Sequence, residues 1–234
     1  MMSKEHKKAT AEKGFENIGE ALSSSEHFIE KNQKTILWAL LAIVAVVGGI
    51  IAFNYMYKNP RNEKAQAAIF KGERFFQNQE DSIALFGNGN DYIGFENIMK
   101  EFSGTKTANL ARAYAGISYS RLGNNEKALK YLNEFKGSDL LITPAIEGAI
   151  GDVYMNMGNT DKAISHFNNA AKEANDEMLS PIYYNKAGFA YLSAKNYAKA
   201  IETFRMIKEK YINSPQGQEA DKYIEAAKLQ ESGN

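Results

Sequence analysis

The hydrophobic pattern changes once along the chain. Residues 35–57 carry no charge and open with the run TILWALLAIVAVVGGIIAF. As a helix rising about 1.5 Å per residue, this run crosses a hydrocarbon core of about 30 Å. Beyond it, apolar residues recur at three- and four-residue steps, without the sustained two-residue alternation of strands. We therefore predict an all-α protein, with a single transmembrane helix at 35–57 and a helical domain at 59–234.

Aromatic residues at both ends of the apolar run support a membrane span. Trp38 stands near one end, and Tyr55 and Tyr57 near the other, where interfacial anchors are expected. A buried helix of a soluble protein would show a polar face, which this run lacks. A cleaved signal peptide usually has a shorter apolar core and a small-residue cleavage site, whereas Asn-Tyr-Met-Tyr follows here.

Small residues form a stripe on one face of the predicted span, at Ala42, Ala45, Gly49 and Ala52. Such a stripe lets a second helix approach closely, in a homodimer or with another protein. Small residues are also common in any membrane helix, so the sequence leaves both interpretations open.

The segment before the span, residues 1–34, is too short for a domain. Phe15, Ile18 and Leu22 share one helical face, so it is either an amphipathic helix on the membrane surface or a weakly ordered tail. Lysine and arginine close to the span slightly favour a cytoplasmic C-terminal domain. That rule weakens for long translocated domains, so charge alone does not decide the orientation.

After the span the chain repeats, in the order small-x-x-Tyr, turn, Ala-x-x-x-Leu or Phe. The three sets are Gly116, Tyr119, Ala128 and Leu132; Gly151, Tyr154, Ala163 and Phe167; Gly188, Tyr191, Ala200 and Phe204. The glycines and alanines allow two helices of a hairpin to pack closely, and the large residues are expected to pack towards the next hairpin. Gly123 and Gly158 suit the left-handed end of a helix.

These sets predict an α-solenoid of about four hairpins. They are a degenerate hairpin at 60–103, repeats at 107–137, 143–175 and 179–212, and a capping helix at 216–231. Asn59-Pro60 is expected to end the membrane helix and start the next one. In the first hairpin, helices at 65–79 and 92–102 flank the insertion EDSIALFGNGND. The insertion, around Ile83, Leu85 and Phe86, is either a second binding surface or a cover for that hairpin.

The repeats resemble the tetratricopeptide (TPR) family, whose period is 34 residues, because the glycines recur after 35 and 37. The arrangement of tail, span and repeats resembles the YfgM-type ancillary proteins of the bacterial Sec translocon. The stretches EHFIEKNQK, GNGNDYIGFENI, GTKTANLARAYAGISY and YINSP resemble TPR membrane proteins of Bacteroides-like bacteria. The resemblance implies a bacterial cytoplasmic (inner) membrane location, a periplasmic C-terminal domain, and Sec translocon subunits or periplasmic chaperones as partners.

Composition and motifs argue against catalysis and cofactors. The net charge is zero, which disfavours nucleic-acid binding, and the absence of cysteine removes thiolate chemistry. His6, His27 and His166 show no metal-ligand spacing. The glycine-rich 87–90 and 104–107 lack a complete phosphate-loop spacing and a preceding strand. We interpret them as turns, with Asp91 and Thr107 able to cap the following helices. We expect no enzyme activity and no cofactor.

A binding groove is expected along the first helices of the hairpins, which line the inner wall of such a superhelix. The candidate residues are Ser120, Arg121, Asp152, Met155, Asn156, Asn185 and Phe189. Each can also be read as an ordinary solvated or neighbour-packed position. Ala113, Ile117, Gly148 and Asp152 stand where the family's carboxylate clamp would need polar or basic groups, so capture of an acidic chaperone tail is disfavoured.

The sequence thus predicts a membrane-anchored TPR scaffold for protein partners, most consistent with an ancillary role at the Sec translocon or in its periplasmic chaperone network. The alternative is an adaptor for another envelope assembly, such as outer-membrane protein delivery. A signalling or enzymatic receptor domain is a third class, disfavoured by the missing chemistry.

Overall fold

The computed structural model describes residues 31–137 and 141–233. Within these ranges the chain is helical and contains no strand, which confirms the predicted all-α class. The chain divides into two compact units, Met1–Pro60 and Arg61–Asn234. The predicted tail at 1–34 lies almost entirely outside the described residues.

The apolar segment forms one helix that continues further than predicted. Lys31–Gln77 is helical throughout and is, within the described ranges, the one helix long and apolar enough to cross a membrane. The prediction that Asn59-Pro60 ends this helix was wrong. A π-helical turn, η1 (Asn54–Lys58), precedes α2 (Asn59–Gln77), and the Asn59 N–H donates to the Asn54 carbonyl five residues back. This wider turn accommodates Pro60, whose ring would clash with the preceding turn of a regular α-helix.

The small-residue stripe of this helix meets no neighbour in the described chain. Ala42, Ala45, Gly49 and Ala52 are all exposed, and a β-carbon on Gly49 would meet nothing within 4 Å. Among the residues that the structure describes, the stripe is therefore unpacked.

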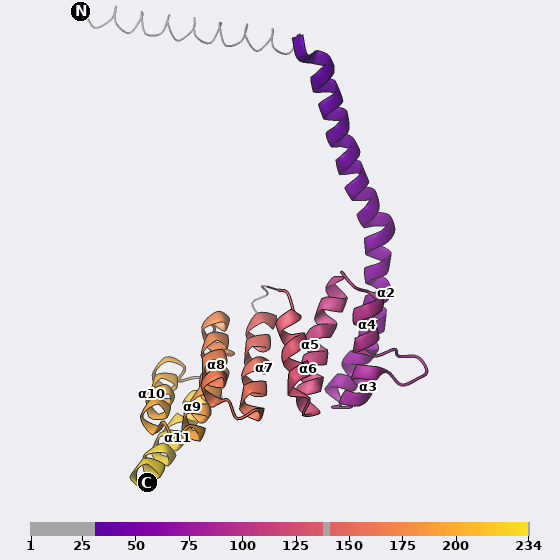
Figure 1. The fold of residues 1–234 in the computed structure, drawn as a ribbon. Coiled ribbons are helices and arrows are strands. Elements are labelled where there is room, and N and C mark those ends of the chain that lie inside the picture. Colours follow the sequence, from indigo (N-terminus) through magenta and orange to yellow (C-terminus); the bar gives the residue numbers. More distant parts are fainter. Residues whose placement is uncertain (1–30, 138–140, 234) are drawn as a thin grey trace, which may run out of the picture. The chain divides into compact units, whose positions relative to one another are not determined.

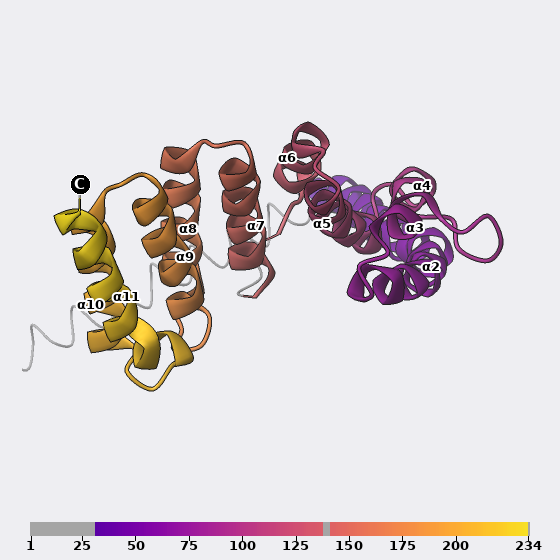
Figure 2. The same cartoon turned by 90° about the horizontal axis from the view of Figure 1, so that it is seen from below.

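The second unit is a series of helical hairpins (Figure 1). The elements after α2 are α3 (Asp81–Phe86), α4 (Phe95–Glu101), α5 (Lys106–Arg121), α6 (Asn125–Glu134), α7 (Ile142–Asn156), α8 (Thr160–Ala174), α9 (Ser180–Ser193), α10 (Tyr197–Lys210) and α11 (Pro215–Ser232). From α7 to α11, each helix packs against the next, as Figure 2 also shows.

Glycines bring the two helices of each hairpin together. A β-carbon on Gly116 would lie 2.6 Å from Leu132, one on Gly151 2.6 Å from Phe167, and one on Gly188 2.5 Å from Phe204. The three large side chains therefore fill glycine notches in their own hairpin. The expectation that they point towards the next hairpin was incomplete: Phe204 does both, since its ring also lies 5.3 Å from Tyr223 of α11.

The turns inside the hairpins repeat the same chemistry. Gly123, Gly158 and Lys195 occupy equivalent positions with φ of 78°, 73° and 57°. The next residues, Asn124, Asn159 and Asn196, cap the second helices by accepting the backbone N–H of Lys127, Lys162 and Lys199. Left-handed backbone followed by an asparagine N-cap ends one helix and starts the next within three residues.

The first hairpin pairs α2 with α4 around a glycine notch at Gly72, which receives Phe95 and Tyr92. The insertion between these helices is not an open loop: it holds the short helix α3. Leu85 is fully buried, and the Tyr92 hydroxyl donates to the Ala84 carbonyl over 2.7 Å. The insertion therefore covers the hairpin, as one of the two alternatives proposed, and only Phe86 of its three large apolar residues is strongly exposed.

Three local predictions in and just after the insertion were wrong. The second helix begins at Phe95 rather than Tyr92, because Gly94 has a φ of 85° and Tyr92 is held by Asn88. Asp91 does not cap that helix; it pairs with Lys71 over 2.7 Å, and the Asn88 side chain followed by Lys71 lowers its pKa to about 2. Helix α5 is capped by Thr105 rather than Thr107, whose hydroxyl instead meets Asn62.

Helix α11 covers the last hairpin. Its buried residues, Gly217, Ala220, Ile224 and Ala227, face α9 and α10, and its N-terminus is capped by Ser214. The charged residues of this helix are exposed. A terminal helix with one polar face is what a repeat array needs in order to end in water.

Candidate protein-binding surface

The predicted groove residues lie on α5, α7 and α9, the first helices of three successive hairpins. Ser120 and Arg121 are the last residues of α5, and Asp152, Met155 and Asn156 belong to α7. Asn185 and Phe189 belong to α9. None of the seven is fully buried.

Two polar contacts join neighbouring first helices. The Asn156 side-chain amide donates to the Ser120 hydroxyl over 3.4 Å, which links α7 to α5. The Lys186 ammonium lies 2.6 Å from the Asp152 carboxylate, which links α9 to α7. Sequence reasoning missed Lys186, although it follows Asp152 by about one repeat period and could have been found by comparing charges at that spacing.

Arg121 has a packing partner that the sequence did not suggest. Its guanidinium lies 3.4 Å from the carboxylate of buried Asp81, donates to the Phe76 carbonyl, and sits 4.3 Å above the Phe76 ring. These contacts join α5 to α2 and α3. The geometry therefore gives Arg121 a role in holding the first two hairpins together.

Met155 and the two candidate residues on α9 are partly occupied by packing within the domain. The Asn185 carbonyl oxygen is buried and accepts no hydrogen bond from the described residues. Phe189 is 41% exposed, and its edge meets Tyr223 of α11 at 4.8 Å between centroids. Met155 packs against the cluster around Phe167. Asn156, Arg121 and Phe189 are the exposed members of the set, and Asp152 is half-buried.

A polar cluster lies where α4, α5 and α6 meet. The hydroxyls of Tyr119 and Tyr131 donate to the Glu96 carboxylate, and Lys127 lies 3.6 Å from it. Burial alone would raise the pKa of Glu96, but the Tyr119 hydrogen bond, Lys127 and Tyr131 outweigh it and lower the pKa. Burial, followed by Glu96, raises the pKa of Tyr131 to about 12. At neutral pH the cluster therefore contains a carboxylate between two neutral phenols, and it stabilises the α4–α6 packing.

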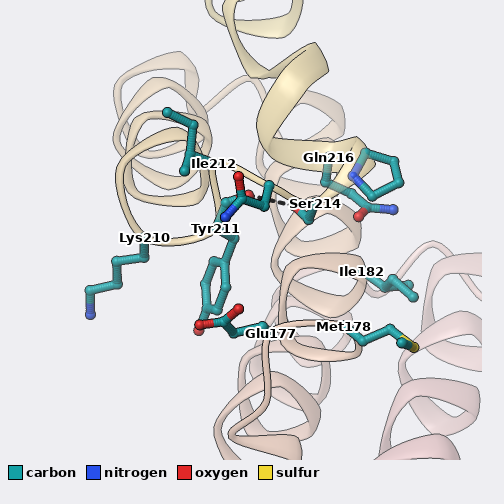
Figure 3. A pocket seen from close by; sticks show the side chains of 10 residues that line it. Glu177, Met178, Ile182, Lys210, Tyr211, Ile212, Ser214 and Gln216 are labelled. Carbon is teal, nitrogen blue, oxygen red and sulfur yellow. Dashed lines mark hydrogen bonds between the residues drawn. The ribbon is translucent and has the colours of Figure 1, made fainter.

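A pocket of about 380 Å³ opens between the loop that precedes α9 and the loop that joins α10 to α11 (Figure 3). Met178 and Ile182 form one wall, and Ile212 and Gln216 lie on the other, with Tyr211 turned towards Glu177. Met178 and Ile212 are 74% and 63% exposed. Exposed apolar side chains around a concavity are typical of surfaces that bind proteins.

Comparison with protein families identifies two segments of this array. Residues 148–177 and residues 186–214 each match a tetratricopeptide repeat model. The first match runs from within α7 through α8, and the second from within α9 to the loop before α11. Searches of the curated proteins and of the solved structures gave no match. The described second unit is therefore a helical array that contains tetratricopeptide repeats, an architecture that generally serves as a scaffold for binding other proteins.

Proposed function

We propose that this protein is a membrane-anchored scaffold whose repeat domain binds protein partners along the first helices α5, α7 and α9. The observation that carries the proposal is the pair of tetratricopeptide repeats, whose first helices present exposed Asn156, half-buried Asp152 and partly exposed Phe189. Polar groups of this kind hold a bound segment in register, and nearby apolar groups contribute affinity. The anchor is the apolar part of the Lys31–Gln77 helix.

The partners we propose are subunits of the bacterial Sec translocon or its periplasmic chaperones, with the repeat domain on the periplasmic side of the inner membrane. The arrangement of span and repeats supports this assignment through its resemblance to YfgM-type proteins.

Site-specific photocrosslinking of the full chain tests this proposal. A photoreactive residue at Asn156 samples the first-helix face, and one at exposed Arg205 on α10 provides a matched control. We expect covalent adducts with Sec subunits or export chaperones from position 156 and none from position 205. Equal yields from both positions, or adducts only with outer-membrane delivery factors, would contradict the Sec assignment. The second outcome would support the adaptor alternative.

A further inference from the structure

We propose that the corner of the repeat domain at which its chain begins, around Arg61, binds the surface of an anionic lipid bilayer through four lysines: Lys64, Lys100, Lys106 and Lys136. This inference depends on the proposed membrane anchor. It goes beyond the anchor because it assigns a second, electrostatic membrane contact to the folded domain itself.

Contacts inside the domain gather these lysines at one end. Lys64 lies one turn after Arg61, whose guanidinium donates to the Glu101 carbonyl over 2.6 Å, beside Lys100. Lys106 is followed by Thr107, which is hydrogen bonded to Asn62. The backbone of Lys136 pairs in both directions with the Asn109 side chain, close to the start of α5. Residues distant in sequence therefore share one corner of the domain.

A wide groove opens at the same corner. It has a volume of about 1160 Å³, and its walls include Lys106, Arg112, Lys136, Asn109 and Asn133. Arg112 is matched by Glu134 at 3.8 Å. All four lysines of the proposed site are exposed, and none forms an ion pair with a carboxylate in the described part of the chain. The four lysines outnumber the nearby Glu63 and Glu101, and Glu134 in the groove wall is already paired with Arg112.

The length of the connecting chain keeps this corner near the membrane. Arg61 lies four positions after Tyr57, the last residue of the uncharged run. These positions span about 6 Å as a helix and no more than about 14 Å when extended. Arg61, and the Glu101 carbonyl that it contacts, are therefore tethered within a short distance of the end of the uncharged run. Exposed cations within about a Debye length of 8–10 Å of anionic headgroups are attracted to them.

The test uses the full chain in symmetric vesicles, so that the result does not depend on which side the domain occupies. The protein has no cysteine, so Ser103→Cys places a single fluorophore on the exposed loop between α4 and α5. Lipids with a nitroxide on the headgroup quench the fluorophore when the loop touches the surface. We expect quenching about twofold greater with roughly 30 mol % phosphatidylglycerol than with phosphatidylcholine alone, and loss of the difference near 0.5 M salt.

Two charge-removal variants identify the residues responsible. Changing Lys64, Lys100, Lys106 and Lys136 to Gln should abolish the difference between the two lipids, because glutamine keeps the helix propensity and removes the charge. Changing the equally exposed Lys172, Lys195, Lys210 and Lys222 to Gln is the matched control and should leave the difference intact. Equal quenching in both lipids, or equal loss in both variants, would overturn the inference.

Flotation of the same samples separates this inference from the proposed anchor. If the protein floats with both vesicle types but its quenching does not depend on the lipid, only the proposed membrane contact of the four lysines is overturned. Protein that fails to float with phosphatidylcholine vesicles would contradict the anchor itself.

Discussion

The ring of Phe167 occupies the space in which a side chain on Gly151 would lie. A β-carbon added to Gly151 would come within 2.6 Å of two ring atoms, and the ring itself is only 2% exposed. The same relationship joins Gly116 to Leu132 and Gly188 to Phe204. The two helices of each of these hairpins can thus approach closely because the residue at their contact is glycine, which has no β-carbon.

Gly151→Ala should therefore destabilise the domain although alanine favours helix. We expect the free energy of unfolding to fall by about 1–3 kcal/mol, because the buried ring must move and the gain in helix propensity is only about 1 kcal/mol. Urea unfolding followed by circular dichroism of the full chain in detergent measures the change. Ser165→Ala, at an exposed position of α8, is the control and should change stability by less than about 0.5 kcal/mol. If Gly151→Ala is as stable as the parent, the Phe167 ring does not require the space beside Gly151 to be empty.

The equivalent turn residues Gly158 and Lys195 should respond in opposite directions. Both have positive φ, of 73° and 57°, which costs a residue with a β-carbon about 1–2 kcal/mol. Gly158→Ala should lower the unfolding free energy by about 1 kcal/mol. Lys195→Gly should relieve strain and leave stability equal or slightly higher, since glycine also loses more backbone entropy on folding. A loss in both variants would mean that the lysine side chain, rather than the backbone, stabilises its turn.

Glu96→Gln should reduce stability in a pH-dependent way. The folded chain lowers the pKa of Glu96 below its ordinary 4.5, so its carboxylate stabilises the fold fully above that value. The contribution is lost as pH falls through the folded pKa. We expect a deficit of about 1–3 kcal/mol near pH 7 that shrinks below about pH 4.5. Glu209→Gln, at an exposed position, provides the baseline. A deficit that stays constant with pH would exclude an effect of ionisation.

Arg121→Met separates a structural role from a binding role. Removing the guanidinium leaves Asp81, 6% exposed, without its ion partner, and we expect a loss of about 1–3 kcal/mol. Replacing Asp81 by Asn in the same chain should recover part of that loss, because no buried charge remains unpaired. If Arg121→Met unfolds like the parent but loses photocrosslinking from position 156, Arg121 belongs to the binding surface instead.

The proposed orientation is tested by a single cysteine at Lys172, an exposed residue of α8. A thiol reagent that cannot cross membranes should label Lys172→Cys in intact spheroplasts, because we place the repeat domain in the periplasm. Labelling only after lysis would reverse the orientation. The parent chain, which has no cysteine, reports background.

The repeated part of the fold could be predicted from sequence because each structural requirement recurs as a residue type. Two helices that cross closely need glycine or alanine at the contact, and a large apolar side chain must fill the space beside it. Gly151 and Phe167 meet these two requirements at positions that recur in each repeat, so both could be predicted. The same reasoning applies to Gly158 at the left-handed turn. Each requirement is local or repeats at a constant spacing, so no knowledge of long-range contacts is needed.

The remaining contacts depend on spatial neighbours that no spacing reveals. The pairing of Arg121 with Asp81 joins residues forty positions apart through an insertion that breaks the repeat. Asn88 forms the turn that ends the insertion by accepting three backbone N–H groups, and its side chain also bonds Asp91, which therefore does not cap α4. The residues of the candidate groove lie on the first helices, as predicted, but the sequence could not show that Asn185 is enclosed and Arg121 is already paired. Whether they bind a partner stays a prediction.

The outward face of α11 also limits how copies of this protein can meet. Asp221, Lys222, Glu225 and Lys228 are exposed there, so a second array stacked end to end on this face would have to strip water from these charges. Removing that water costs free energy, so the outward face of α11 disfavours end-to-end association of copies at this end of the array.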